Sequence, residues 1–505
     1  MKQFKIIFNI WVVFAFIGIN LSAAEAAKTN KRFDLVKNST TSADSSNKNF
    51  KQVYDKKLKR KRSFKNKIIV RFKAQTTDVS IQEYFQKNNL IPVKKLSKRS
   101  YSCKFAQTEI SEEDLIAFVD AGADMSEIGT SDFNLVDLDI DEVRELKIDS
   151  ANQAPKKSVA NKTLTPSQWY LKGSISDSSN TEFDINVDQA WNHTKGAGIK
   201  VAVIDTGFDL KHNDINYYNQ GYDVVENIAS AQAPERSKEN HGTAVAGIIA
   251  AKDNEFGVVG VAPEAQIIPI RLIAEDGEVY VSDIIDAHHK AIEYGATIIN
   301  NSWGSYDPTT PDGYVSELTE LENQLYQELA EEANNGKGVV VIFAAGNSGE
   351  GNFNRAPEAR DDSNFAVGAI DSLGKRASYS VYGGELDVVA PGGDIYKAIV
   401  TTDRRDIKIK NLKTNKAKLY ILGYDRGDYA MNFKGTSASA PVVAGIAALV
   451  WAANPNLKAS EVKQIIKDSA RRDFNPNYSF SGSGYNQELG YGLVDAGAAV
   501  EQALQ

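Results

Sequence analysis

Between residues 199 and 343 the sequence alternates short apolar runs with helix-like segments, and this alternation restricts the fold more than any other feature. Strands are predicted at residues 199–204, 267–272, 297–300 and 338–343. Helices are predicted from His241 onward and at 282–294 and 315–334. Strands that alternate with helices build a parallel sheet, whose faces the helices cover. The predicted fold class is therefore α/β: a doubly wound parallel sheet with helices on both faces.

Four polar residues stand at the ends of predicted elements. Asp205 ends the first strand in Asp-Thr-Gly, and Asn347 follows the strand at 338–343 in Ala-Ala-Gly-Asn. His241 opens a helix in His-Gly-Thr, and Ser437 opens another in Gly-Thr-Ser-Ala-Ser-Ala-Pro. Alone, a strand-end carboxylate, a turn amide or an N-cap serine has an ordinary structural interpretation. In a parallel sheet, however, ligands bind at the carboxyl ends of the strands, where these residues are expected to gather.

Together the four residues suit acyl transfer. Ser437 would attack a carbonyl carbon, because the first turn of a helix offers unpaired N–H groups and the positive end of the helix dipole. His241 would accept the serine proton and pass it to the leaving group, while Asp205 fixes the imidazole tautomer. Asn347, with the N–H of Ser437, would hold the oxyanion.

These motifs resemble those of the subtilisin-like serine proteases, over residues 167–505. The resemblance implies their α/β fold and endopeptidase activity, with Asp205, His241 and Ser437 as the triad and Asn347 as the oxyanion donor. It also implies an edge segment that pairs with substrate, made of Ser302, Trp303 and Gly304. This segment and the Ser437 motif are similar to those of the kexin-like branch, although no accessory β-domain of that branch is expected here.

The resemblance further implies a structural calcium site. Asp214 and Asn254 match an Asp and an Asn that bind Ca²⁺ in relatives, and Gln168 matches a Gln near the mature N-terminus. Carboxylate, amide and backbone oxygens are hard ligands that suit calcium. The alternative is a polar loop, 252–258, that is hydrogen-bonded only to itself.

Four segments are predicted before the peptidase domain at 167–505. Residues 1–26 have a basic start, an apolar run and a small-residue exit, which predict a secretory signal peptide; an uncleaved membrane anchor is the alternative. Residues 27–66 predict a disordered basic tail. Residues 67–146 predict a small α+β unit that resembles, more loosely, the family's inhibitory and folding-assistant propeptide. Residues 147–166 predict a linker that contains the maturation site.

Composition restricts stability and partners. Among 505 residues Cys103 is the only cysteine, so no internal disulfide can form. The densest basic patch of the tail, residues 56–62, has no interleaved aromatic residues, so no nucleic-acid partner is expected despite its charge. No apolar stretch after residue 26 is expected to span a bilayer, so we expect no stable membrane anchor. We expect a monomeric protein that is secreted, to the medium or a periplasm, and whose partners are protein or peptide substrates and its own propeptide.

Two other classes of function could use these residues. An esterase or transacylase could run acyl-enzyme chemistry with the same triad, although Ser437 lacks the Gly-x-Ser-x-Gly setting of the α/β-hydrolases. A catalytically silent binding protein would predict damage to the triad, and the four motifs are intact. Residues 394–434 form a longer stretch than the family usually has there, which predicts an added hairpin near the cleft or a tolerated surface insertion.

Overall fold

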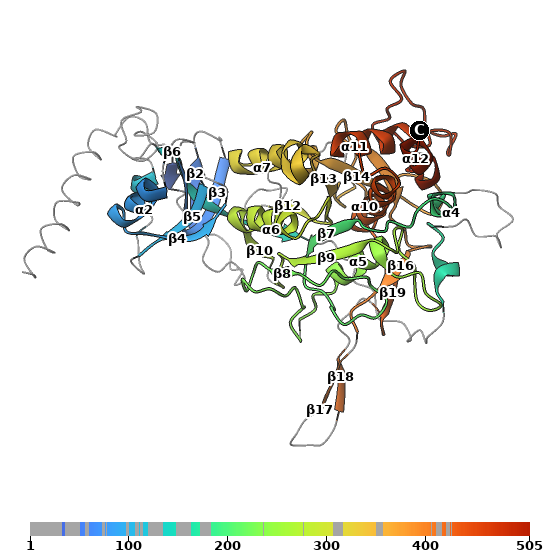
Figure 1. Cartoon of the computed structure of the whole chain (residues 1–505), viewed down its shortest axis with the longest axis horizontal. Helices are drawn as coiled ribbons and strands as arrows, with labels where there is room; N and C mark the ends of the chain where they lie inside the picture. The colour runs from blue at the N-terminus through green and yellow to red at the C-terminus, as the bar shows by residue number, and fades with distance from the viewer. Residues whose placement is uncertain are drawn as a thin grey trace, which may run out of the picture. The chain divides into compact units, whose positions relative to one another are not determined.

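The computed structural model (Figure 1) describes residues 33–35, 51–55, 60–72, 76, 78–96, 100–106, 111, 115–119, 135–147, 163–171, 183–235, 237–275, 277–306, 317–349, 357–405, 407–410, 417–420, 425 and 427–505. The chain divides into two compact units. Unit 1 comprises residues 1–144 with 280–282, and unit 2 comprises residues 145–279 and 283–505. The predicted signal peptide and residues 148–162 of the predicted linker lie outside the described residues.

Unit 1 is an antiparallel sheet with helices. Its strands are β1 (Phe33–Leu35), β2 (Lys51–Asp55), β3 (Arg60–Phe72), β4 (Leu90–Lys95), β5 (Ser100–Phe105) and β6 (Leu135–Lys147), and its helices are α2 (Asp78–Lys87) and a short helix at 115–119. From β3 to β6 the order is βαββαβ, with β6-β3-β5-β4 across the sheet. The core packs the rings of Phe72 and Phe85 against Ile68 and Leu115.

The sheet of unit 1 also extends into residues that the sequence assigned to a disordered tail. Strand β2 pairs antiparallel with the first part of β3, with Lys51 opposite Phe64, and β1 pairs in turn with β2. The tail is rich in polar residues, so its strands arise from backbone pairing with β3 rather than from an apolar periodicity that a sequence could display.

Unit 2 contains a seven-stranded parallel sheet, which confirms the predicted fold class. In spatial order its strands are β15 (Val388–Pro391), β14 (Phe365–Ile370), β13 (Val340–Ala344), β11 (Ile298–Asn301), β7 (Lys200–Asp205), β9 (Gln266–Arg271) and β8 (Tyr222–Asp223). Every neighbouring pair runs parallel. The four predicted strands are β7, β9, β11 and β13, each found within two residues of its expected ends.

Helices cover both faces of this sheet (Figure 1). One face carries α5 (His241–Ala250), α10 (Thr436–Ala453) and α12 (Ala496–Ala503), and the other carries α6 (Val281–Glu293) and α7 (Glu320–Glu331). Along β13, Ile342 belongs to the core shared with α5 and α10, whereas the ring of the next residue, Phe343, lies 5.7 Å from that of Tyr326 in α7. Because successive side chains of a strand point to opposite faces, the strand is buried on both sides. The remaining helices are η1 (Thr165–Ser167), α4 (Val187–Trp191), α8 (Ala333–Gly336), α9 (Pro357–Arg360) and α11 (Ala459–Asp468).

Helix α10 departs from one sequence expectation. Among the described residues it is the one helix long and apolar enough to cross a membrane by length and composition. Most of it is buried inside unit 2, where the backbone of Gly445 packs against Val261. Its apolar character therefore serves the protein core.

Residues 394–434 contain two antiparallel strand pairs. Strand β16 (Ile399–Thr402) pairs with β19 (Tyr429–Phe433), and β17 (Ile407–Lys410) forms a hairpin with β18 (Ala417–Tyr420). The remaining described strands are short: β10 (Glu278–Tyr280) and β12 (Gly304–Tyr306). Within unit 2, β12 pairs antiparallel with the last three residues of β6, so that Lys147 lies opposite Gly304.

Candidate active site

The carboxylate of Asp205 holds the imidazole of His241. Strand β7 ends at Asp205, α5 begins at His241, and the Nδ1 atom of His241 lies 2.8 Å and 3.0 Å from the two carboxylate oxygens. Because a carboxylate only accepts, Nδ1 carries the proton and Nε2 is the basic nitrogen. The two residues are 0% and 2% exposed, and within the described part of the chain Nε2 has no hydrogen-bond partner. The pair thus presents a buried base with one free nitrogen.

The Asp-Thr-Gly and His-Gly-Thr motifs interlock around this pair. The backbone N–H of Thr206 donates to Asp205 Oδ1 at 2.7 Å, and the Thr206 hydroxyl accepts the N–H of Gly242 at 3.0 Å. A Cβ atom at Gly242 would lie 2.8 Å from the carbonyl oxygen of Thr206, so this contact requires glycine. Thr206 therefore orients both members of the pair, a role that the sequence analysis did not assign.

Ser437 lies in the first turn of α10 and contacts Ser302. Gly435, the N-cap of α10, has φ of +121°, which favours glycine. The Ser437 hydroxyl donates to the Ser302 carbonyl at 3.0 Å, and the Ser302 hydroxyl donates to the Ser437 carbonyl at 3.1 Å. Because Ser302 follows β11, the neighbour of β7, this reciprocal contact holds Ser437 at the sheet edge where Asp205 lies. The serine hydroxyl is thus bonded to Ser302, and catalytic hydrogen bonds often form only when substrate is bound.

Asn347 lies at the same edge, after β13, and is tied to the Ser437 turn. Its Oδ1 accepts the backbone N–H and the hydroxyl of Thr436, at 2.8 Å and 3.0 Å. The Thr436 hydroxyl also accepts the N–H of Gly346 at 3.1 Å. With Oδ1 engaged, the Nδ2 donors of Asn347 are left for another acceptor, which is the orientation an oxyanion donor needs.

A buried ionic cluster lies beside Asp205. Arg271 stands opposite Asp205 in the pairing of β7 with β9, and its guanidinium donates to Glu239 at 2.6 Å and 2.8 Å and to Asp223 at 2.8 Å. Burial opposes the charge of Arg271, but its bonds to Glu239 and Asp223 raise its pKa. Glu239 also accepts the N–H of Gly207 at 2.9 Å. The sequence analysis missed this cluster, which joins the residues around Asp205 to the segment before His241.

The predicted substrate segment, Ser302 to Gly304, is held in place by the buried side chain of Trp303. The indole N–H of Trp303 donates to the carbonyl of Ile204 at 2.7 Å, and its ring packs on Phe343 at 5.3 Å and on His288 at 6.5 Å. His288 is fully buried, as predicted for a core residue, and burial lowers its pKa to about 4. Gly304 begins β12, the strand that pairs with residues 145–147. The segment from Ser302 to Gly304 therefore combines a buried anchor with an edge that accepts another strand.

The predicted calcium ligands Asp214 and Asn254 lie together. Asp214 is buried, and its oxygens accept Asn254 Nδ2 at 2.8 Å, the N–H of Val258 at 3.1 Å and the hydroxyl of Tyr429. Within the described ranges no lysine or arginine pairs with Asp214, and burial raises the pKa of its carboxyl. A buried carboxylate without a lysine or arginine partner is one feature of a calcium site, but Asn254 turns its NH2 donor, not its oxygen, toward Asp214.

Other parts of the expected ligand set are already engaged. Gln168 donates through Nε2 to Val259 O at 2.8 Å and accepts the Val259 N–H at 2.9 Å, so both ends of its amide bind the loop backbone. Asn254 Oδ1 accepts the N–H of Phe256 at 3.1 Å. Among the described residues no group of three or more His, Cys, Asp or Glu side chains could hold a metal. Of the expected ligands, the Asp214 carboxylate is therefore the one that lacks a cationic partner, while Gln168 and Asn254 have their amide oxygens bonded to backbone N–H groups.

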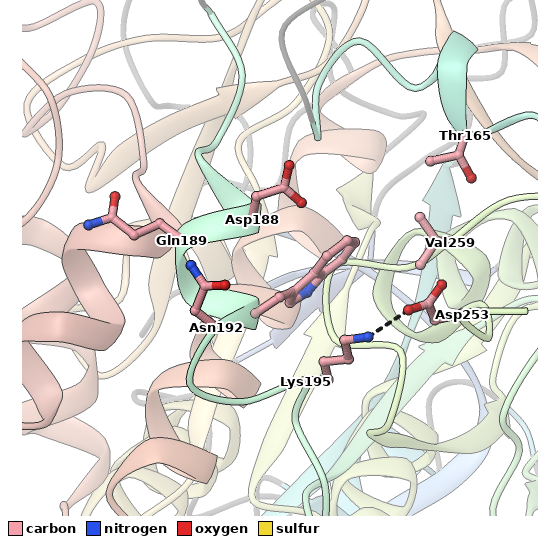
Figure 2. Close-up of a pocket in the computed structure, with 8 residues that line it drawn as sticks. Thr165, Asp188, Gln189, Asn192, Lys195, Asp253 and Val259 are labelled. Atoms are coloured by element: carbon pink, nitrogen blue, oxygen red, sulfur yellow. Dashed lines mark hydrogen bonds and ion pairs between the residues drawn. The ribbon is translucent and has the colours of Figure 1, made fainter.

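A surface pocket lies next to this loop and apart from the triad (Figure 2). Its lining includes Trp191 and Asn192 from the end of α4, Asp253 from the loop, and Val259, which directly follows the loop. Lys195 pairs with Asp253 at 2.6 Å, drawn as a dashed line in Figure 2, and this bond raises the pKa of Lys195. Asp253 is thus engaged with a cation and does not join Asp214.

Comparison with known proteins agrees with this geometry. The model of the subtilase family matches residues 196–492, a span that includes all four candidate catalytic residues. A calcium-dependent protease of Trichormus variabilis is 33% identical over 352 residues, which are 67% of this chain and 51% of that protein. Subtilisin DY of Bacillus licheniformis is 33% identical over 278 residues, which are 55% of this chain and 85% of that protein.

Among solved structures, fervidolysin from Fervidobacterium pennivorans, a keratinolytic enzyme related to subtilisin, matches with a TM-score of 0.60. The match has 22% identity and covers 86% of this chain and 61% of fervidolysin, and it shows a shared fold. The chain spans about half the length of the calcium-dependent proteases it matches.

Proposed function

The chain belongs to the subtilase family, and on that premise we propose that it is an exported serine endopeptidase, made as a self-processing zymogen. The observation that carries the proposal is the contact of His241 Nδ1 with both oxygens of Asp205, at 2.8 Å and 3.0 Å, which leaves Nε2 free to act as a base. An imidazole held in this tautomer is what activation of a serine hydroxyl requires.

In the proposed reaction Ser437 Oγ attacks the carbonyl carbon of a peptide bond. Its hydroxyl leaves the Ser302 carbonyl and transfers its proton to His241 Nε2, and Asp205 stabilises the imidazolium. Asn347 Nδ2 and the N–H of Ser437 bind the oxyanion. His241 then protonates the leaving amine, and water hydrolyses the acyl-enzyme with His241 again as base.

Substrate is proposed to bind as an added strand. The support is β12, whose edge already accepts residues 145–147 as an antiparallel partner, with Lys147 opposite Gly304. Main-chain pairing gives affinity for extended peptides with little demand on their sequence. The same contact supports a zymogen, because the chain that precedes the linker lies on the strand that substrate would use. Unit 1 would then be the propeptide, and the cut would fall between residues 147 and 166.

Calcium is proposed to stabilise the 252–258 loop. Asp214 and Asn254 would hold the ion, which would supply the positive charge that the buried Asp214 lacks. Two relatives are named calcium-dependent proteases. Export is proposed from residues 1–26 alone.

Casein and a small ester, given to wild type and to His241→Ala, test the proposed activity. We expect wild type to cut both and to react with a fluorophosphonate probe, and His241→Ala to lose all three reactions. If wild type cuts the ester but not casein, the esterase alternative is favoured. If wild type reacts with neither substrate nor the probe, a catalytically silent binding protein is favoured.

A further inference from the structure

The inserted stretch 394–434 contacts the segment that carries His241. Helix α5 begins at His241, and its N-cap residue, Asn240, makes no side-chain capping bond. A helix start without such a cap depends on other anchors for its position. We call residues 233–235 and 237–240, which lead into His241, the approach loop.

Arg404, from the insertion, binds the backbone of the approach loop. Its side chain is buried, and its two terminal nitrogens donate to Pro234 O and Ser237 O, both at 2.5 Å, and at longer range to the carbonyls of Ala233 and Glu239. A planar guanidinium presents five N–H donors in a rigid fork, so it can reach several carbonyls at once in fixed directions. The guanidinium of Arg404 thus ties the backbone of the approach loop to the insertion.

Arg271 also binds the approach loop. It binds the side chain of Glu239, whose carboxylate also accepts the N–H of Gly207 at 2.9 Å. Two buried arginines therefore bind the approach loop, Arg404 through backbone carbonyls and Arg271 through the side chain of Glu239. Arg271 is part of the parallel sheet, whereas Arg404 belongs to the insertion.

Strand β16 makes a third attachment, directly on the first turn of α5. The hydroxyls of Thr401 and Thr402 donate to the carbonyls of Ala244 and Thr243, each at 2.7 Å. The approach is close because residue 247 of α5 is glycine: a Cβ there would lie 2.1 Å from the Thr402 hydroxyl. These contacts fix carbonyls two and three residues after His241.

We propose that Arg404 and Thr402 are positioning residues that hold the His241 turn in its catalytic place, and that this is a function of the insertion. The inference rests on the proposed function, since positioning has meaning only if His241 is the base. Neither residue touches the reacting atoms, so its loss should change the rate of bond making and leave substrate binding at β12 intact.

The test compares Arg404→Gln with Lys463→Gln. Lys463 is the control, because it is a half-buried cation that also donates to backbone carbonyls, those of residues 362, 363 and 364, ahead of β14. We expect Arg404→Gln to lower kcat by about 10-fold or more with KM within about 2-fold, because small displacements of a catalytic group cost up to about 10²-fold. The rate of fluorophosphonate labelling should fall with kcat. Lys463→Gln should lose thermal stability to a similar degree and keep kcat.

Two variants with smaller structural changes keep the test valid if Arg404→Gln fails to fold. Thr402→Val removes the hydroxyl at nearly constant volume, and we expect kcat to fall several-fold, with recovery in Thr402→Ser. Variants that do not mature unaided are processed by added wild-type enzyme before assay. Folded Arg404→Gln and Thr402→Val with wild-type kcat, or a kcat loss shared by Lys463→Gln, would overturn the inference. An inactive wild type would instead overturn the proposed function.

Discussion

Thr436 fixes the side-chain amide of Asn347 in one orientation. Both the backbone N–H and the hydroxyl of Thr436 donate to Oδ1, at 2.8 Å and 3.0 Å. The amide cannot flip without setting N–H donors against N–H and O–H donors. The nitrogen of Asn347 is consequently the atom left to face a substrate oxygen.

Removal of the Asn347 amide should lower kcat with little change in KM. For Asn347→Ala we expect a loss of about 10²–10³-fold, the cost established for the corresponding amide in subtilisin. Thr436→Val should cost about 5-fold, since a neutral hydrogen bond contributes about 1 kcal/mol and 1.4 kcal/mol is tenfold. Steady-state kinetics on a peptide amide measure both, with Thr436→Ser as control. A KM effect larger than the kcat effect would contradict the oxyanion assignment.

The buried His288 should weaken the fold in mild acid. Its pKa is about 4 in the folded chain against 6.5 for an ordinary histidine. As pH falls from 6.5 toward 4 the unfolded chain binds a proton that the folded chain does not, so the free energy of unfolding decreases, by about 2 kcal/mol between pH 7 and 5.

Urea unfolding at pH 7 and pH 5 tests this effect, in a Ser437→Ala background that suppresses self-digestion. The variant His288→Phe should lose about 2 kcal/mol less than its parent over this interval, because its ring cannot be protonated. Equal losses in parent and variant would show that His288 does not contribute.

Calcium should stabilise the protein through Asp214. We expect wild type to unfold at a higher temperature in calcium than in EGTA, since an ion at 100 times its Kd adds about 2.7 kcal/mol. Asp214→Asn should remove the difference. Asp253→Asn is the matched control in the same loop, because Asp253 pairs with Lys195 instead, and it should keep the full response. A calcium response that survives in Asp214→Asn would place the ion elsewhere.

Self-processing should depend on the pairing of residues 145–147 with β12. Proline at all three positions removes their N–H donors and cannot continue the ladder, so the full-length form should accumulate. Alanine at the same three positions keeps the N–H donors and the pairing, and should not slow maturation. Gel analysis during expression compares the two, and equal processing rates would separate maturation from the β12 contact.

Sequence reasoning recovered the parts of the protein that depend on local patterns. Apolar runs located β7, β9, β11 and β13, because strands buried on both faces have few polar positions. The geometry then joined Asp205 to His241 and Asn347 to the turn before Ser437, from motifs far apart in the chain.

Other contacts could not be predicted because they depend on which segments meet in space. Arg271 and Glu239 are ordinary charged residues in the sequence, and only the β7–β9 register brings their pair beside Asp205. Likewise, nothing in the local sequence indicates that Arg404 reaches Pro234, 170 residues away. Strand β2 was missed for a related reason, because its residues are polar and its order comes from pairing with β3.

The most direct test of the account is intact-mass and N-terminal analysis of purified wild type beside Ser437→Ala. The account predicts that wild type loses its N-terminal region up to a bond between residues 147 and 166, while Ser437→Ala keeps it. Identical maturation of the two proteins would mean that another protease makes the cut and would contradict self-processing by Ser437.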